Sequence, residues 1–130
     1  MEVEISLPEE KPTIGKVSQI GIVVRPQEEM MARYAFFELV NERTDKRAPM
    51  DRVTSRSRYF YRYNIEKDIK MNEENRYSFP MRIPVHKEPS RNDKFIYIKW
   101  QLSLKLILSK NEEDKEMWCG EATPIELEVV

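Results

Sequence analysis

One stretch of the sequence, from residue 43 to residue 62, combines basic and aromatic side chains at close spacing. It holds seven Arg or Lys residues against two Asp residues, a local charge of +5, and Tyr59, Phe60 and Tyr61 stand among them. Arginines contact phosphates and aromatic rings stack on unpaired bases, so this combination is typical of single-strand nucleic-acid binding. The same charges would also bind an acidic protein partner. The candidate contacts are Arg52, Arg56, Arg58 and Arg62.

The same stretch has a structural explanation that needs no ligand. Side chains of a strand alternate between two faces, so one parity would enter the core and the other would meet water. The inward set would be Tyr59, Tyr61 and Tyr63, and the outward set Arg58, Phe60 and Arg62. Acidic residues gather near the ends of the chain, with a local charge of −6 from residue 111 to residue 130. Charge pairing between strands then accounts for the basic stretch.

Few residues in the sequence are suited to catalysis or metal binding. His86 is the only histidine and has no second His or Cys nearby, so we expect an exposed loop residue. Cys119 follows the acidic run 112–116, which would raise its thiol pKa, and we expect a small buried hydrophobe. The run itself has adjacent carboxylates and no glycine, unlike a calcium loop. We therefore predict no enzyme activity, no metal and no cofactor.

The composition indicates one charge-rich domain, residues 1–130. Charged residues make up 35% of the chain but the net charge is −1, so overall charge cannot attract a polyanion. There is no apolar run long enough to span a membrane and the N-terminus is acidic, so we expect a cytoplasmic protein with a reduced thiol. With 18 Glu and 3 Gln, the composition is similar to that of hyperthermophile proteins.

Apolar and polar residues alternate through most of the chain. Seven apolar residues occupy the even positions from 96 to 108, and two residues turn a helix by about 200°, so they cannot form one helical stripe. The stretch 77–85 repeats the pattern with Pro80 and Pro84 facing outward, which predicts an edge strand because proline donates no hydrogen bond. Shorter alternating segments are 3–7, 20–24, 33–41, 59–65 and 125–129. Seven or eight such strands predict an all-β sandwich.

The segments between these strands are polar and contain few glycines. The longest expected connection is 41–58, and 86–94 and 110–116 are shorter. Only three glycines leave few tight primed hairpin turns, so we expect irregular connections at the ends of the sandwich, where binding sites commonly lie. One helical turn is predicted at Gln27 to Ala32, directly after a proline.

The centre of the chain resembles an arrestin-type domain. The residues that carry the resemblance are Phe79-Pro80, Ile83-Pro84, the Pro89-Ser90 loop, the strand Ile98 to Leu104 with Trp100, the lead-in 65–74 and the closing segment Thr123 to Leu127. The family includes arrestins, the retromer vacuolar-sorting subunit and sporulation-control-like proteins. Its members are immunoglobulin-like β-sandwiches that act as non-catalytic adaptors or scaffolds, and most carry two such domains, whereas this chain has the length of one.

The resemblance implies an immunoglobulin-like, arrestin-type antiparallel β-sandwich. Its expected core contains Trp100, Leu102, Leu104, Phe79 and Ile83. We expect a non-catalytic adaptor or scaffold domain that binds a protein partner, and the alternative is a nucleic-acid-binding module that uses residues 43–62. An unpaired edge strand or an apolar outer patch would recruit that partner or a second copy as a homodimer. The terminal strand 125–129, which has no interior proline, is a candidate for such an edge.

Overall fold

The computed structural model describes residues 1–47, 50–113 and 115–130, and all regular structure within these ranges is β-strand. The strands are β1 (Glu2–Ser6), β2 (Val17–Arg25), β3 (Met30–Asp45), β4 (Arg52–Ile69), β5 (Asn75–Arg82), β6 (Arg91–Asn92), β7 (Ile96–Ser109), β8 (Trp118–Glu121) and β9 (Ile125–Leu127). Across these ranges, no helix has the length and apolar character needed to cross a membrane.

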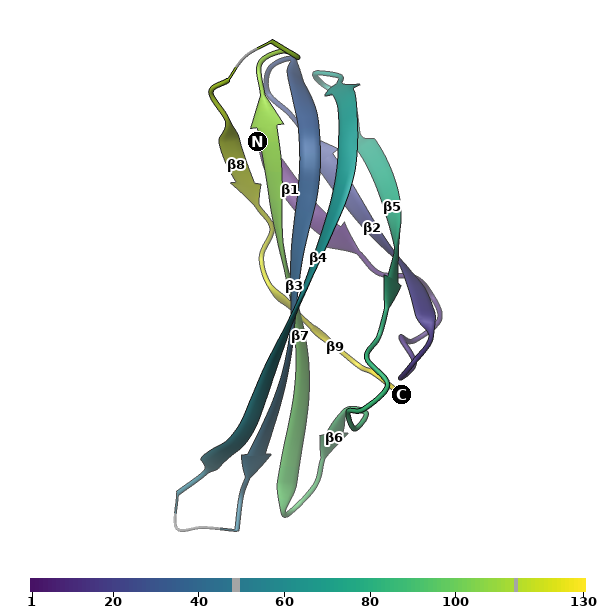
Figure 1. Ribbon diagram of the computed structural model, residues 1–130, viewed down its shortest axis with the longest axis vertical. Helices are drawn as coiled ribbons and strands as arrows, with labels where there is room; N and C mark the ends of the chain where they lie inside the picture. The colour runs from purple at the N-terminus through teal and green to yellow at the C-terminus, as the bar shows by residue number, and fades with distance from the viewer. Residues whose placement is uncertain (48–49, 114) are drawn as a thin grey trace.

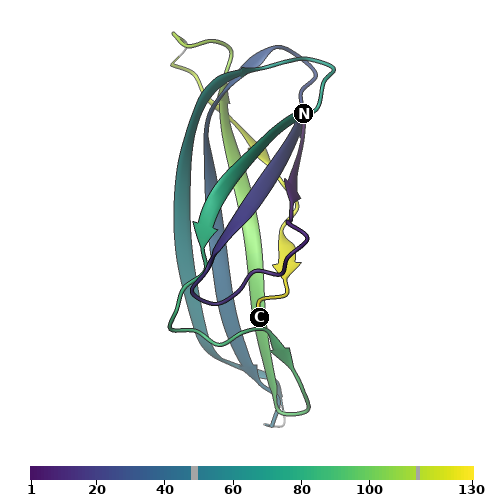
Figure 2. The same cartoon turned by 90° about the vertical axis from the view of Figure 1, so that its right-hand side faces the viewer.

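The strands form two antiparallel sheets that pack face to face (Figures 1 and 2). The smaller sheet has the order β1-β2-β5. In the larger sheet β4 pairs with β3 and β3 with β7, while β6, β9 and β8 pair one after another with the remaining side of β7. The predicted antiparallel sandwich is confirmed, with nine strands in the described ranges where seven or eight were predicted.

The core lies where the inward faces of both sheets meet. The even-numbered residues of β7 from 96 to 108 are all buried, as the alternation predicts. Trp100 is 0% exposed, and its indole N–H donates a hydrogen bond to the carbonyl oxygen of Glu88 at 3.0 Å. The residues predicted to share the core with it are buried as well: Leu102, Leu104, Phe79 and Ile83.

The prediction that residues 41–58 form the longest connection is wrong, because most of them belong to the hairpin of β3 and β4. The two strands pair from Asn41 opposite Ser57 to Asp45 opposite Arg52. Residues 52–56 are exposed on both faces, so no apolar alternation marks this part of β4 as a strand. Figure 1 shows the reason: this end of the hairpin extends beyond the smaller sheet, which covers only the other half of β3 and β4.

The prediction of a helical turn at 27–32 is also wrong, because β3 begins at Met30. Met30 pairs with Ile69 on β4, and Met31 pairs with Ser109 on β7. The local preference of Met and Ala for helix is small. Pairing with a strand on each side outweighs this helix preference. The pairing also buries all three residues from 30 to 32.

The edges of the sandwich differ from one another. Within the described ranges β5 pairs with β2 and with no other strand, which confirms the edge position predicted from its prolines. The terminal strand is not an open edge, contrary to expectation. Beyond β9, the amide of Val130 donates to the carbonyl of Pro12, and the carbonyls of Val130 and Val129 accept from the amides of Ile14 and Ser90. The last residues are therefore bonded to two loops.

Replacing Trp100 by Ala is expected to lower the free energy of unfolding by about 3–5 kcal/mol, because the core loses its largest side chain and leaves a cavity. Urea unfolding followed by circular dichroism measures the loss. In a Trp118→Phe variant Trp100 is the sole indole, and we expect the short-wavelength emission of a buried ring in the native state. Emission typical of a hydrated indole would contradict this placement.

Candidate functional site

The four candidate arginines lie on β4, the outermost strand of the larger sheet. Within the described ranges the backbone of β4 pairs with β3 and with no other strand. Its alternation is as predicted, with Arg58, Phe60 and Arg62 exposed and Tyr59, Tyr61 and Tyr63 partly buried against the core. Arg52 and Arg56 are exposed farther along the strand, on the part that extends beyond the smaller sheet. One strand thus presents all four arginines.

The inward tyrosines of β4 connect the two sheets. The Tyr61 hydroxyl donates a hydrogen bond to the carbonyl oxygen of Arg82 at 2.7 Å, and the Tyr63 hydroxyl donates to the carbonyl of Pro80, also on β5. The Tyr63 ring stacks on Phe79 with a centroid distance of 4.9 Å. Burial raises the pKa of both hydroxyls. These rings fill the space between β4 and β5 and are not free to stack on a ligand.

The outward arginines contact side chains of the neighbouring strand β3. The two ion pairs are Arg58 with Glu38 (Nε to Oε1, 2.8 Å) and Arg56 with Glu42 (Nε to Oε2, 3.8 Å). The Arg62 guanidinium lies over the ring of Tyr34, 3.8 Å from its centroid. Pairing between strands therefore occurs as expected, but these carboxylates come from β3 and not from the acidic segments near the chain ends.

An aromatic patch lies on the outer face of the larger sheet, beside these arginines. Phe60 stacks on Phe36 of β3 with a centroid distance of 5.7 Å. A shallow hollow of about 230 Å³ adjoins them and is lined by Tyr34, Phe36, Arg62, Lys105 and Ile107. Sequence reasoning missed the contribution of β3. The signal was present, because Tyr34 and Phe36 occupy the parity opposite to the buried Ala35 and Phe37.

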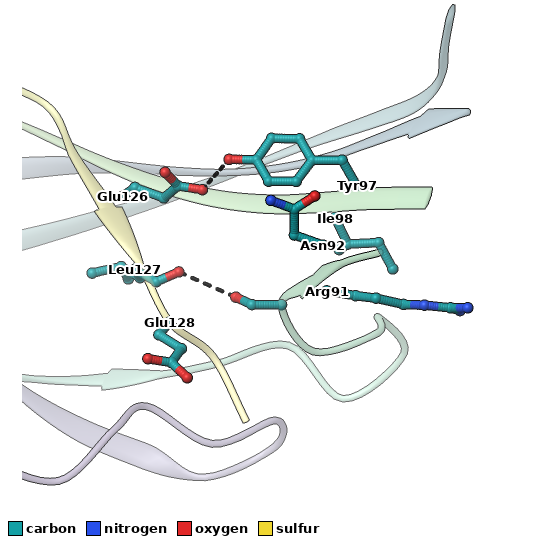
Figure 3. A pocket seen from close by; sticks show the side chains of 8 residues that line it. Arg91, Asn92, Tyr97, Ile98, Glu126, Leu127 and Glu128 are labelled. Atoms are coloured by element: carbon teal, nitrogen blue, oxygen red, sulfur yellow. Dashed lines mark hydrogen bonds between the residues drawn. The ribbon is translucent and has the colours of Figure 1, made fainter. Parts of the chain in front are cut away.

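A larger hollow, of about 480 Å³, lies where β6 and β9 meet β7 (Figure 3). The Tyr97 hydroxyl bonds to the carboxylate of Glu126 across it, and this bond raises the pKa of Tyr97 to about 12. The Ser90 hydroxyl donates to the carbonyl of Leu127 at 3.1 Å and accepts from the amide of Val129 at 2.8 Å. The polar groups that line this hollow thus hold the terminal strand β9 in place.

The remaining candidate residues stand apart from these surfaces. His86 is exposed on the connection after β5, as predicted. Cys119 is exposed, so the prediction of a buried thiol is wrong: in β8 the alternation turns Trp118 and Gly120 inward and Cys119 outward. Partial burial and the nearby Glu121 raise its pKa. Among the described residues, no group of three or more His, Cys, Asp or Glu side chains is placed to hold a metal ion.

No family model matches the sequence, and no curated protein matches it. Among solved structures, the chain is similar to Spo0M, the sporulation control protein from Bacillus subtilis, with a TM-score of 0.62 and 12% sequence identity. The match covers 98% of this chain and 48% of the Spo0M chain, so this chain spans about half the length of that protein. The chain therefore has a two-sheet antiparallel β-sandwich fold like that of Spo0M, which confirms the arrestin-like fold that the resemblance implied.

Replacing Tyr61 and Tyr63 by Phe is expected to cost about 0.5–1.5 kcal/mol of unfolding free energy for each hydrogen bond lost. Since folding raises both pKa values, this contribution is complete below the ordinary tyrosine pKa of about 10 and is lost as the pH rises above it. Unfolding free energies from urea titrations at about pH 7 and about pH 11 test both points.

The unmodified protein should lose stability over this pH interval, and the double variant should lose less. Tyr59→Phe is the matched control, because Tyr59 is the third inward tyrosine of β4 but its hydroxyl makes no hydrogen bond to any of the described residues. An equal loss in the double variant and the unmodified protein would contradict the role assigned to the two hydroxyls.

Proposed function

We propose that this domain is a non-catalytic protein-interaction module, an adaptor or scaffold, that binds its partner through β4 and the outer face of the larger sheet. The observation that carries the proposal is the aromatic patch. Phe60 is 56% exposed at the centre of the strand, stacked on Phe36 and flanked by arginines. Exposed aromatic rings combined with arginine are enriched where proteins bind one another.

Protein binding accounts for this surface better than nucleic-acid binding does. A single-strand binding face needs several rings that are free to stack on bases. Here the hydroxyls of Tyr61 and Tyr63 bond to the backbone of β5, so these two rings are not available to stack on bases. The chemistry of the other side chains supports a domain without catalysis, because the raised pKa of Cys119 disfavours the thiolate that a nucleophile requires.

Site-specific photocrosslinking tests the proposal. A benzophenone amino acid at position 60, introduced into the full chain in cells of the source organism, should form adducts with protein when irradiated. Phe95 is the matched control, since it is also a phenylalanine and is 49% exposed, but it directly precedes β7 and lies beside the end of β3. Protein adducts at position 60 that are absent at position 95 would support the proposal. Adducts with nucleic acid, or no adducts at position 60, would overturn it.

The nucleic-acid alternative has its own test. We expect no gel shift of single-stranded DNA or RNA by the unmodified protein at about physiological salt, and therefore no effect of replacing Arg56, Arg58 and Arg62 together by Ala. A shift whose affinity falls steeply with salt, and which the triple variant abolishes, would favour the nucleic-acid module instead, because released counterions give phosphate binding that salt dependence.

A further inference from the structure

The free edge of β4 has few of the features that normally prevent an edge strand from pairing. The strand has 18 residues and no proline, and it pairs only with β3 within the described ranges. Between its two register shifts it is regular from Ser55 to Asn64. Its inward side chains in that stretch are Ser and Tyr, so no charge points toward the core. Such an edge offers unpaired backbone amides and carbonyls to another strand.

The other long edges of the described sandwich are closed. On β5, Pro80 lacks an amide donor, and the carbonyls of Pro80 and Arg82 already accept the hydroxyls of Tyr63 and Tyr61. The free side of β7 is occupied in turn by β6, β9 and β8. β1 has only five residues. A strand of several residues from another chain can therefore pair with the sandwich at the free edge of β4.

The charge of this edge favours an acidic partner. From residue 52 to residue 64 the strand carries four arginines and no acidic residue. Arg58 contacts Glu38 through Nε, which leaves the two terminal nitrogens of its guanidinium available to further acceptors, and its side chain is 56% exposed. Arg62 stacks on Tyr34 through the flat face of its guanidinium, which leaves the N–H groups at the rim available.

The same arginines disfavour a second copy of this strand as the partner. Antiparallel self-pairing centred on residue 58 sets Arg58 opposite itself, and pairing centred on residue 60 sets Arg58 opposite Arg62. Like charges directly opposite one another destabilise a sheet. A strand of a different protein with carboxylates at these positions has the complementary charge.

We infer that β4 accepts an extended acidic segment of a partner protein as an additional strand of the larger sheet, an inference that rests on the proposed function. Side chains on the outer face recur at every second position, so Arg58, Phe60 and Arg62 select an acidic, an apolar and an acidic residue at the same spacing. The partner motif is therefore acid-x-apolar-x-acid. The backbone of β4 provides the affinity, and its outer face provides the specificity.

A synthetic peptide is the probe for this inference. We choose the blocked peptide Thr-Val-Glu-Thr-Leu-Thr-Glu-Val-Thr and measure its binding to the full chain by nuclear magnetic resonance at low salt. Binding should protect alternate backbone amides between residues 55 and 64 from hydrogen exchange. A peptide with both Glu residues replaced by Gln should bind about 2- to 30-fold more weakly, because two cross-strand charge pairs are lost. N-methylation of the peptide backbone should abolish binding.

Charge reversal identifies the site. Arg58→Glu together with Arg62→Glu should abolish binding of the Glu peptide and create binding of a peptide that carries Lys at those two positions. The matched control is Arg76→Glu together with Lys110→Glu, which changes the net charge equally at exposed positions on other strands and loops and should leave binding unchanged. Circular dichroism verifies that each variant is folded.

Each outcome decides the inference. Protection of β4 with the exchanged charge preference supports it. No binding of the Glu peptide, binding that survives the charge reversal at β4, or a concentration-dependent dimer formed through β4 would overturn it. These failures are distinct from failure of the proposed function: if position 60 crosslinks a protein but the peptide does not bind β4, only strand addition by an acidic segment is lost. If position 60 crosslinks no protein, the proposed function is lost.

Discussion

The pairing of β3 with β7 is the constraint on which the rest of the structure depends. The two strands are paired from Met31 opposite Ser109 to Asp45 opposite Ile96. Because side chains alternate along both strands, this single register decides which residues enter the core. A shift by one residue would expose the side chains of Trp100 and Phe37 to water. It also leaves one free side on each strand. β4 takes the side of β3, and three short strands share the side of β7.

The mismatch in size between the two sheets shapes the surface. The smaller sheet covers one half of the long strands, and the far end of the β3–β4 hairpin extends beyond it (Figure 2). Along β4 the inward residues change accordingly, from tyrosines that reach β5 to small polar residues that meet water. Tyr61 and Tyr63 thus close one side of the sandwich without a covering strand. As a consequence, β4 itself remains a free edge, and Phe60 and the arginines lie along it.

Much of this arrangement could be predicted from the sequence because it follows from a period of two. The alternation from residue 96 to 108 identified the central strand and its buried face, and the prolines of β5 identified an edge. The outward direction of Arg58, Phe60 and Arg62 follows from the same rule. The pattern failed where both faces of a strand are exposed to water, as at residues 52–56. It also failed at 27–32, where residues that favour a helix follow a proline but 30–32 are buried in a strand.

The sequence by itself thus determined the fold class, the core face of each long strand and the side chains that β4 turns to water, because these depend only on local alternation. Which strands become neighbours was decided by the tertiary structure. That choice gave Arg58 and Arg56 their partners Glu38 and Glu42 and placed Phe36 beside Phe60. It also left β4, rather than the terminal strand, with a free edge. Pairing between segments distant in the chain has no local signature, since it depends on which surfaces bury the most apolar area together.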